Sequence, residues 1–272
     1  MKDNLERVVQ WYPGHMARAM RRLGEYVKLI DIVIEVIDAR AVRSDANPML
    51  NRLVGDRSRI VALSREDLAD PMTTKRWVAA FAERGREALA VEARSQQSVS
   101  RILAAVKAKA KLRRGMSRVM VVGVPNSGKS SIINGLLRRG AAKIEDRAGV
   151  TRALQWFRLA SNIELMDTPG ILVPKIATAQ AQWKLALIGA VPRDHYDPVE
   201  VSTEFYHWHE RRTGAKTKVP DLATFAAERG FVRRGGEYDE HNAAQSYIKA
   251  FNDGVFGRIS LEAPGEDDEQ AA

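Results

Sequence analysis

The sequence predicts an α/β fold, in which a mostly parallel sheet carries helices on both faces, followed by a small all-helical C-terminal domain. Two observations support this prediction. Through the first 182 residues, short runs rich in Val and Ile alternate with helical patterns, as they do in covered parallel sheets. From about residue 183, helical patterns dominate and strand-like runs become rare. The expected domains are therefore 1–182 (α/β), 183–262 (helical) and 263–272, an acidic tail that we expect to be disordered.

Six strands are expected in the first domain, and each is a short apolar run bounded by turn residues. They cover residues 31–39, 59–63, 87–93, 118–124, 154–160 and 163–170. The last two runs are close enough in the sequence to form a hairpin. Helices are expected where apolar residues recur with helical spacing. They cover residues near 15–28, 72–84, 96–112 and 130–139.

Two helices are expected in the second domain. Residues 220–230 begin with a Pro and end with a Gly, which are typical start and stop signals of a helix. Residues 240–254 place Ala244, Tyr247, Ile248 and Phe251 along one helical face. We interpret these positions as the core of the small domain.

Composition excludes several classes of protein. The 272-residue chain has no Cys, so disulfides and thiolate metal sites are ruled out, which suits a reducing cytoplasm. The N-terminal residues lack the apolar core of a signal peptide. No apolar run approaches the roughly 20 residues that a membrane span needs. We therefore expect a cytoplasmic protein without a membrane partner.

The net charge of +9 is unevenly distributed. The first 182 residues hold 32 of the 43 Lys and Arg and 18 of the 34 Asp and Glu, whereas the remainder is acidic. The positive excess therefore belongs to the α/β domain. A basic surface usually reflects solubility alone, and it also suits a nucleic-acid partner.

The segment "GVPNSGKSS" matches the phosphate-binding pattern G-x-x-x-x-G-K-[ST], starting at Gly123. It follows an apolar strand and opens a helix, which is the context that this pattern requires. Glycines allow backbone N–H groups to surround the α- and β-phosphates at a helix N-terminus. Lys129 is expected between the β- and γ-phosphates, and Ser130 on Mg²⁺. The loop residues expected to bind nucleotide are Asn126, Ser127, Gly128, Lys129, Ser130 and Ser131.

A second magnesium motif, "LMDTPG", follows a strand downstream. Asp167 is expected to hold Mg²⁺, and the Gly170 N–H to contact the γ-phosphate. A plain Asp-Pro-Gly turn is the alternative, but the phosphate loop upstream favours the functional interpretation. Between the two motifs, "DRAGVTR" offers Thr151 as the residue that contacts both Mg²⁺ and γ-phosphate.

The base-reading motifs of a GTPase, N-K-x-D and S-A, do not appear after Gly170. Before the phosphate loop, however, Ser64, Arg65, Glu66 and Asp67 follow one predicted strand, and Glu92 and Ala93 follow the next. The motif order is then base, base support, phosphate, switch and Mg²⁺. This order is a circular permutation of a P-loop GTPase domain, and both segments are expected to bind the nucleotide.

The chain resembles the circularly permuted GTPases of the ribosome biogenesis GTPase A family. The resemblance rests on "WYPGHMARA", "DAR", "NP", "GVPNSGKSSIIN", "DRAGVT", "DTPGILVPK" and the C-terminal "RGFVRRGGEYDEHNAAQSYIKAFNDGVFGRISLE". It covers nearly the whole chain. It implies a cytoplasmic factor that hydrolyses GTP during late assembly of the large ribosomal subunit, with hydrolysis stimulated by the particle. The implied partners are GTP, GDP, the subunit precursor and its rRNA, and the protein is expected to be monomeric off the ribosome.

The base motif departs from the GTPase pattern at two positions. Ser64 and Arg65 stand where Asn and Lys are usual, whereas Asp67, which distinguishes guanine from adenine, is present. A site built to pair with an exocyclic amine rejects a base that lacks it. We therefore predict a preference for guanine with weakened affinity. Nothing in the sequence explains Glu92 in place of a small polar residue.

The hydrolytic machinery also departs from that of small GTPases. Ile171 stands where many of them have a Gln that orients water, and its side chain can neither donate nor accept a hydrogen bond. Asn126 matches the asparagine of potassium-activated relatives, so K⁺ is expected as a second cofactor beside Mg²⁺. His15, in "WYPGHM", is a catalytic residue by family resemblance, and a structural role beside the Pro-Gly turn is the alternative. Lys129 and Thr151 complete the expected catalytic set.

Two clusters of basic residues are expected to contact RNA phosphates, which predicts salt-dependent binding. They are Arg18, Arg21 and Arg22 on the first helix, and Lys107, Lys111 and Arg114, which share a helical face in the basic segment 101–118. A solvated helix face is the alternative. The stretch "FYHWHERR" (205–212) suits base stacking or, equally, core packing.

Three functions fit the sequence. The first is a ribosome-stimulated GTPase, and the second is a nucleotide-gated RNA-binding scaffold with little intrinsic hydrolysis. The third is a metabolic kinase or ATPase, against which Asp67 and the permuted order argue.

Overall fold

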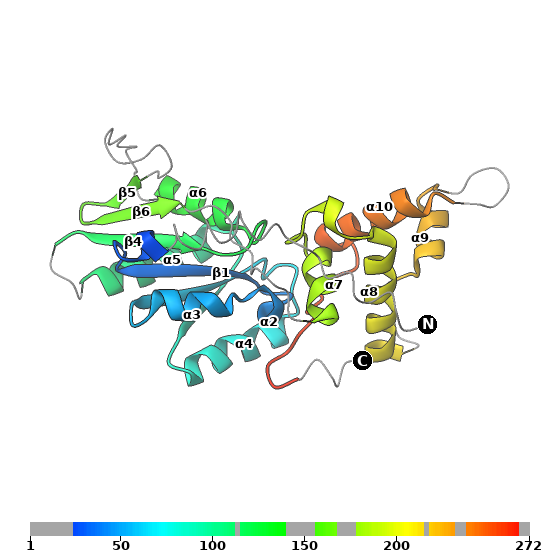
Figure 1. Ribbon diagram of the computed structural model, residues 1–272, viewed down its shortest axis with the longest axis horizontal. Helices are drawn as coiled ribbons and strands as arrows, with labels where there is room; N and C mark the ends of the chain where they lie inside the picture. The colour runs from blue at the N-terminus through cyan, green and yellow to red at the C-terminus, as the bar shows by residue number, and fades with distance from the viewer. Residues whose placement is uncertain are drawn as a thin grey trace.

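The computed structural model describes residues 24–111, 115–139, 156–167, 178–214, 218–231 and 238–266. It forms a sheet unit and a helical unit that lie side by side (Figure 1). The strands are β1 (Ile32–Asp38), β2 (Ser58–Ser64), β3 (Glu87–Val91), β4 (Ser117–Val122), β5 (Trp156–Ala160) and β6 (Ile163–Asp167). The helices of the sheet unit are α2 (Val42–Asp45), α3 (Pro48–Val54), α4 (Pro71–Glu83), α5 (Gln96–Lys111) and α6 (Lys129–Arg139). The helical unit contains α7 (Ala179–Leu187), α8 (Pro198–Thr213), α9 (Leu222–Glu228) and α10 (Glu240–Asn252).

The described strands form one six-stranded sheet in the order β3-β2-β1-β4-β6-β5. All neighbours are parallel except β5 and β6, which form the predicted antiparallel hairpin. β2 and β3 lie on one side of β1 in the sheet, and β4, β6 and β5 lie on the other side. The loops after β2 and β4 therefore lie on the same edge of the sheet, on either side of β1. Ligands bind at such an edge in parallel sheets.

Both faces of the sheet are covered, which explains why its central strands are almost continuously apolar. All seven residues of β1 are buried. One face packs against α5 and α6 through a core that includes Ile34, Val121 and Ile132. The opposite face packs against α3 and α4, with Leu50 on α3 and Trp77 on α4. The α/β prediction with helices on both faces is thus confirmed.

The predicted helices that the structure describes in full, α4, α5, α6, α9 and α10, lie within two residues of their predicted bounds. No bounds were predicted for α7 and α8. Local capping explains where α4 begins. The Asp70 carboxylate accepts a hydrogen bond from the Thr73 N–H at 2.7 Å, and Pro71 occupies the first turn. The short helices α2 and α3 lie in a stretch for which the sequence predicted no element, because neither is long enough to show helical periodicity.

The helical unit has its own aromatic core, built around the buried side chain of Phe205 on α8. The Phe205 ring lies 5.0 Å from the ring of Phe251 and 6.2 Å from that of Tyr247, both on α10. Trp208 is also buried in this core. Phe205 and Trp208 therefore pack in the interior and do not stack on bases. Among the described helices, none is both long and apolar enough to cross a membrane.

The predicted boundary between residues 182 and 183 falls inside α7. Trp183 and Leu187 of this helix are buried in the core of the helical unit, so the whole of α7 belongs there. The same core includes Ala41 and Val124 of the sheet unit. The two units therefore share a packed interface.

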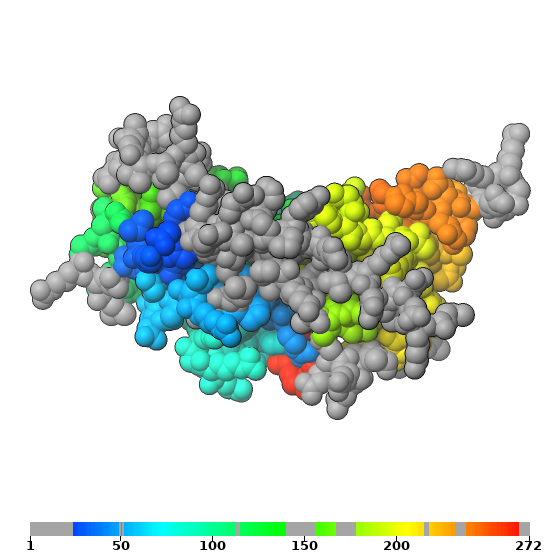
Figure 2. Space-filling model, in the orientation of Figure 1, coloured from blue at the N-terminus to red at the C-terminus, as the bar shows by residue number. Residues whose placement is uncertain are grey.

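Residues 258–266 follow the last helix and connect the two units, and we call them the C-terminal strap. Ile259 and Leu261 belong to the core of the helical unit, and neighbouring residues contact the sheet unit. In Figure 2 the visible part of the strap, in red, lies beside the blue and cyan surface of the sheet unit. The expectation of a disordered tail from residue 263 is wrong for residues 263–266. The Arg43 guanidinium donates to the carbonyl oxygens of Ala263 and Glu266, and Ala263 is buried. Residues 267–272 lie outside the described part.

The strap is fixed by a buried ion pair. The Lys184 ammonium on α7 lies 3.4 Å from the Glu262 carboxylate, and both side chains are 1% exposed. Glu262 also accepts hydrogen bonds from the backbone N–H of Arg43 and the Ser44 hydroxyl, which belong to α2. One carboxylate of the strap therefore joins the sheet unit to the helical unit.

Candidate nucleotide-binding site

The phosphate loop lies between the end of β4 and the start of α6, as the sequence predicted. A side chain at Gly123 would meet the Val36 carbonyl oxygen at 2.5 Å, so only glycine fits there. Gly128 has a φ of +95°, which also favours glycine, and Asn126 has a φ of +58°. The backbone thus takes a conformation that ordinary side chains avoid, as expected of a loop whose N–H groups surround an anion.

Lys129 is placed over this loop. It begins α6, is 8% exposed, and its ammonium donates to the Val124 carbonyl oxygen at 2.6 Å. The ammonium is therefore held within the loop, in reach of anions that bind the surrounding N–H groups. Ser130 and Ser131, also in the first turn of α6, are exposed, whereas Ser127 is buried.

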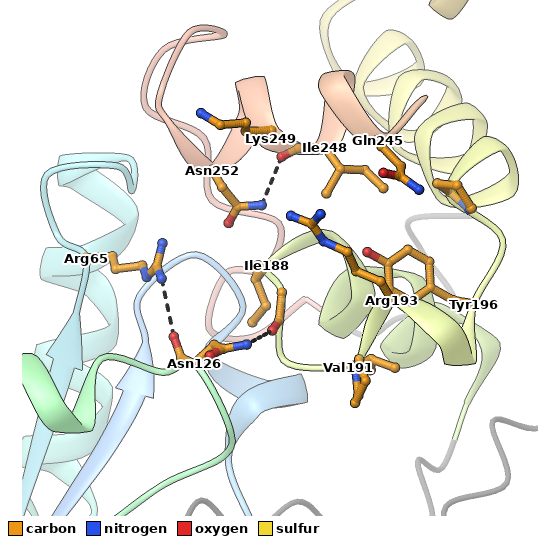
Figure 3. A pocket seen from close by; sticks show the side chains of 13 residues that line it. Arg65, Asn126, Ile188, Val191, Arg193, Tyr196, Gln245, Ile248, Lys249 and Asn252 are labelled. Carbon is orange, nitrogen blue, oxygen red and sulfur yellow. Dashed lines mark hydrogen bonds between the residues drawn. The ribbon is translucent and has the colours of Figure 1, made fainter. Parts of the chain in front are cut away.

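The loop after β2 joins the phosphate loop directly. The Ser64 hydroxyl donates to the Ser127 carbonyl oxygen at 2.6 Å, although the two residues are 63 positions apart in the sequence. The Arg65 guanidinium donates to the Asn126 carbonyl oxygen at 3.3 Å (Figure 3). The segment predicted to recognise the base and the segment predicted to bind the phosphates are therefore in hydrogen-bonding contact.

The remaining residues of the base segment point in different directions. Asp67 is exposed in the turn that follows β2. The Glu66 carboxylate instead faces α5, where it lies 3.3 Å from the Ser98 hydroxyl and 3.6 Å from the Arg101 guanidinium. The side chain of Glu66 is therefore engaged away from the phosphate loop, and Asp67 is left as the carboxylate available to a base.

Glu92 and Ala93 follow β3, which is parallel to β2, so they lie at the same edge of the sheet. The two strand ends are connected by a hydrogen bond from the Glu66 N–H to the Val91 carbonyl oxygen at 3.3 Å. This placement is the one that a base-supporting segment needs. The structure offers no reason for a carboxylate at position 92.

The donors available to a metal ion are oxygens. Asp167 ends β6, in register with Val121 of β4, so its backbone lies beside the strand that leads into the phosphate loop. Its side chain is outside the described part. Ser130 supplies an exposed hydroxyl at the start of α6. A hydroxyl and a carboxylate on adjacent segments fit Mg²⁺, which prefers oxygen ligands.

Several predicted site residues lie outside the described part of the chain. They are His15, Arg18, Arg21, Arg22, Arg114, Thr151 and Gly170. Of the predicted RNA contacts, Lys107 and Lys111 are described, and both are exposed on α5. Their roles stay predictions.

The helical unit reaches the phosphate loop, which the sequence did not predict. The Asn126 side-chain amide donates to the carbonyl oxygen of Gly189, which follows α7, at 2.7 Å. A cavity of about 260 Å³ lies beside this contact, between the two units (Figure 3). Arg65 and Asn126 line one side, and the opposite side is lined by Arg193, Tyr196, Gln245, Lys249 and Asn252. The Asn126 side-chain nitrogen is therefore engaged with the helical unit.

Buried charged residues, Asp38 and Arg40, lie at the end of β1 next to the site. Arg40 is 1% exposed, and it donates to both carboxylate oxygens of Asp38, which ends β1, at 2.9 and 2.7 Å. It also donates to the Asn252 side chain on α10 at 3.1 Å. The "DAR" segment, noted in the sequence only as a family marker, therefore links the sheet edge to the helical unit. No sequence signal could have paired Arg40 with a residue more than 200 positions away.

Asp45 belongs to the same cluster. One of its oxygens accepts a hydrogen bond from the Asp38 N–H at 2.7 Å, and the other is buried without a partner among the described residues. Burial, helped by the neighbouring Asp38 carboxylate, raises the pKa of Asp45 to about 8. Asp45 therefore keeps its proton to a higher pH in the folded protein than in the unfolded chain.

This pKa makes stability depend on pH. Between about pH 4 and pH 8 the folded state keeps the Asp45 proton and the unfolded state has lost it, so the free energy of unfolding falls as pH rises. The Asp45→Asn variant has no such proton. Over this pH range we expect its free energy of unfolding to fall less than that of the unmodified protein, by at least about 1 kcal/mol. Urea unfolding at pH 5 and pH 8 measures the difference. Equal pH dependence of both proteins would show that Asp45 is ionised in the fold.

Comparisons with known proteins fit this geometry. Residues 118–210 match the family described as 50S ribosome-binding GTPase, and the match begins at the strand that leads into the phosphate loop. The chain is 34% identical over 285 residues to the ribosome biogenesis GTPase A of Bacillus cereus, covering 97% of this chain and 96% of that protein.

Two solved structures of YlqF from Thermotoga maritima, one bound to GDP and one to GNP, are also similar. Each has a TM-score of 0.72 and 28% identity, and each is covered completely by this chain. They span 90% and 92% of this chain. The likeness therefore includes both the sheet unit and the helical unit.

Proposed function

Because the chain belongs to the ribosome biogenesis GTPase A family, we propose that this GTPase acts in late assembly of the large ribosomal subunit. In this proposal it hydrolyses GTP to GDP and phosphate, and the ribosomal particle stimulates the reaction. It works in the cytoplasm as a monomer, and its partners are the subunit precursor and its rRNA.

One observation supports the nucleotide site most strongly, the hydrogen bond of 2.6 Å between the Ser64 hydroxyl and the Ser127 carbonyl oxygen. It joins the segment that reads the base to the segment that binds the phosphates. Since Ser64 replaces the asparagine usual in this motif, its hydroxyl takes over the bracing of the phosphate loop. Guanine recognition then falls to Asp67, whose carboxylate accepts hydrogen bonds from N1 and N2 of the base.

The phosphate loop performs the next task, which is to hold the triphosphate and offset its charge. Backbone N–H groups of residues 123–130 bind the phosphate oxygens at the N-terminus of α6, where the helix dipole favours anions. Lys129 adds a positive charge between the β- and γ-phosphates. Ser130 and Asp167 are the residues that would hold Mg²⁺, which supplies further charge neutralisation when it is bound. Thr151 and Gly170 complete the contacts to the γ-phosphate in this proposal.

Water must be oriented by groups other than the residue after Gly170, because Ile171 has no hydrogen-bonding side chain. We assign this role to His15 and the charge-offsetting role to K⁺ on the Asn126 oxygen. Both roles rest on family resemblance and on the placement of Asn126 in the loop. Replacing K⁺ by Na⁺ should therefore lower the hydrolysis rate.

The permuted order connects the nucleotide to the helical unit. Residues 168–177, which include the segment after the Mg²⁺ motif, lead directly into α7. Contacts to the γ-phosphate can therefore bias the position of α7 and, through the Gly189 carbonyl, of the phosphate loop itself. Lys107 and Lys111 on α5, with Arg18, Arg21, Arg22 and Arg114, are the proposed contacts to rRNA phosphates.

Multiple-turnover hydrolysis of GTP, with and without purified large subunits, tests the proposal. We expect the subunit to raise the rate by at least about 10-fold, since a group that completes a GTPase site in trans contributes 10³ or more in favourable cases. Unchanged turnover together with nucleotide-dependent subunit binding would favour the scaffold alternative, for which the Ile171 substitution is the argument. Hydrolysis of ATP as fast as GTP would contradict both.

A further inference from the structure

The C-terminal strap runs along the base-recognition loop, which consists of residues 64–70. The Arg258 side chain donates to two backbone carbonyls of this loop, those of Glu66 and Ala69, the latter at 2.8 Å. The Ile259 N–H donates to the Leu68 carbonyl oxygen at 3.0 Å. Three of the four carbonyls on either side of Asp67 are therefore held by a segment almost 200 residues away.

The loop makes few such bonds of its own. Within it, the Leu68 N–H donates to the Arg65 carbonyl oxygen at 3.0 Å. Its last residue, Asp70, donates its backbone N–H to the Ser260 hydroxyl of the strap at 3.1 Å. A loop with unbound carbonyls has access to many conformations, and fixing them removes conformational entropy before a ligand arrives.

The strap is itself held in place by hydrogen bonds to the sheet unit. The Leu261 N–H donates to the Arg40 carbonyl oxygen at 2.6 Å, and the Trp77 indole donates to the Glu262 carbonyl oxygen at 3.2 Å. Both Leu261 and Glu262 are buried, and Glu262 carries the ion pair with Lys184. The strap is thus fastened immediately beyond the residues that contact the loop.

We propose that Arg258 is a positioning residue for guanine recognition, because its two hydrogen bonds hold the loop in the conformation that presents the Asp67 carboxylate to the base. This inference rests on the proposed function, in which Asp67 binds N1 and N2 of guanine. It assigns the C-terminal strap a part in nucleotide specificity. Ser64, which stands where Asn is usual in the base motif, fixes only the start of the loop. The strap fixes the rest of the loop and so compensates for the missing asparagine.

The test compares the dissociation constants of GDP and IDP for the full-length protein. Hypoxanthine lacks the exocyclic N2 amine, so the ratio of the two constants reports the bond between that amine and Asp67. Arg258→Ala is expected to weaken GDP binding by about 10-fold, the effect of losing roughly 1.4 kcal/mol of loop ordering. IDP binding should change less, so the ratio should move toward one. The Arg258→Lys variant keeps one cationic donor, so it should partly restore the GDP to IDP ratio of the unmodified protein.

Arg76→Ala is the matched control. The Arg76 guanidinium donates to the Pro264 carbonyl oxygen of the same strap at 3.1 Å, but it does not contact the loop. Its GDP to IDP ratio should equal that of the unmodified protein. Because Arg258 and Arg76 are both exposed, both variants are expected to fold. If Arg258→Ala lowers the melting temperature but keeps the ratio, the role is merely structural and the inference fails.

Asp67→Asn separates the inference from the proposed function. If this variant leaves the GDP to IDP ratio unchanged, Asp67 does not bind the base, and the proposed site fails with everything that rests on it. If Asp67→Asn abolishes the discrimination while Arg258→Ala preserves it, the site stands and only the positioning role of Arg258 is overturned.

Discussion

Replacing Lys129 by alanine should lower kcat/KM for GTP hydrolysis by about 1,000-fold, which is the upper range for removing one preorganised group from a charged transition state. The structure gives the physical reason. Lys129 is almost fully buried at the start of α6, and its ammonium is held over the phosphate loop by the Val124 carbonyl. Lys129 is the one positively charged residue among loop residues 123–131, all of which the structure describes. In the proposed site, its loss would leave the charge of the β- and γ-phosphates to the backbone N–H groups alone.

Lys129→Arg should not rescue the activity. The guanidinium is planar and larger than the ammonium, and the space around a side chain that is 8% exposed offers little room for it. Lys28→Ala is the control, because Lys28 is exposed and pairs with Glu25 on the surface. Steady-state hydrolysis and GDP binding measure the effect. A loss of less than 10-fold in Lys129→Ala would mean that the triphosphate does not lie in this loop.

We expect Asp67→Asn to exchange the base preference from guanine to xanthine. In the proposed site the carboxylate accepts hydrogen bonds from N1 and N2 of guanine, whereas the asparagine amide would present a donor to the N2 amine. Removing a partner from such a polar pair changes affinity by roughly 1,000-fold or more, because the opposing group is left unpaired. We therefore expect GDP affinity to fall by about 1,000-fold. XDP, with a carbonyl at that ring position, should instead bind more tightly than it does to the unmodified protein.

Isothermal titration with GDP, XDP and ADP measures this exchange. Asp56→Asn is the matched control, since Asp56 is an exposed carboxylate just before the opposite end of β2. It should leave all three affinities unchanged. If Asp67→Asn weakened GDP, XDP and ADP equally, the residue would support the loop without reading the base.

The sequence predicted the sheet well because its strands are buried on both faces. Such strands are short continuous apolar runs, and β1, β2 and β4 stand out for this reason. The permuted motif order could also be predicted, since the loops after parallel strands meet at one edge of the sheet whatever the chain connectivity. The contact between Ser64 and Ser127 is what that prediction requires.

The rest depended on tertiary contacts that leave no periodic signal. The strap contains no helix or strand, and the sequence assigned its first five residues, 258–262, to the helical domain and the other four, 263–266, to an acidic tail. Its order comes from backbone hydrogen bonds and from the pair of Glu262 with Lys184, neither of which a pattern of apolar residues reveals. The boundary at 182/183 was misplaced for a similar reason. The composition changes within α7, but Trp183 makes the helix part of the second core.

The aromatic stretch 205–212 was compatible with base stacking or with core packing, and the structure shows core packing for Phe205 and Trp208. Phe205 and Trp208 lie on the inner face of α8, where their rings contact α7 and α10, while Tyr206 and His207 lie toward the surface. The spacing of three residues places the two large side chains on one helical face. An interior helix face and an RNA-stacking surface share this pattern, so only the three-dimensional contacts separate them.

A crystal structure of the protein with GDP and Mg²⁺ tests the central claim most directly. The claim is that the base-recognition loop, which precedes the phosphate loop in the sequence, forms a single guanine nucleotide site with it. We predict the diphosphate in the loop 123–130 and both oxygens of the Asp67 carboxylate about 2.8 Å from N1 and N2 of the base. A base bound elsewhere, with Asp67 facing solvent while the diphosphate occupies the loop, would contradict it.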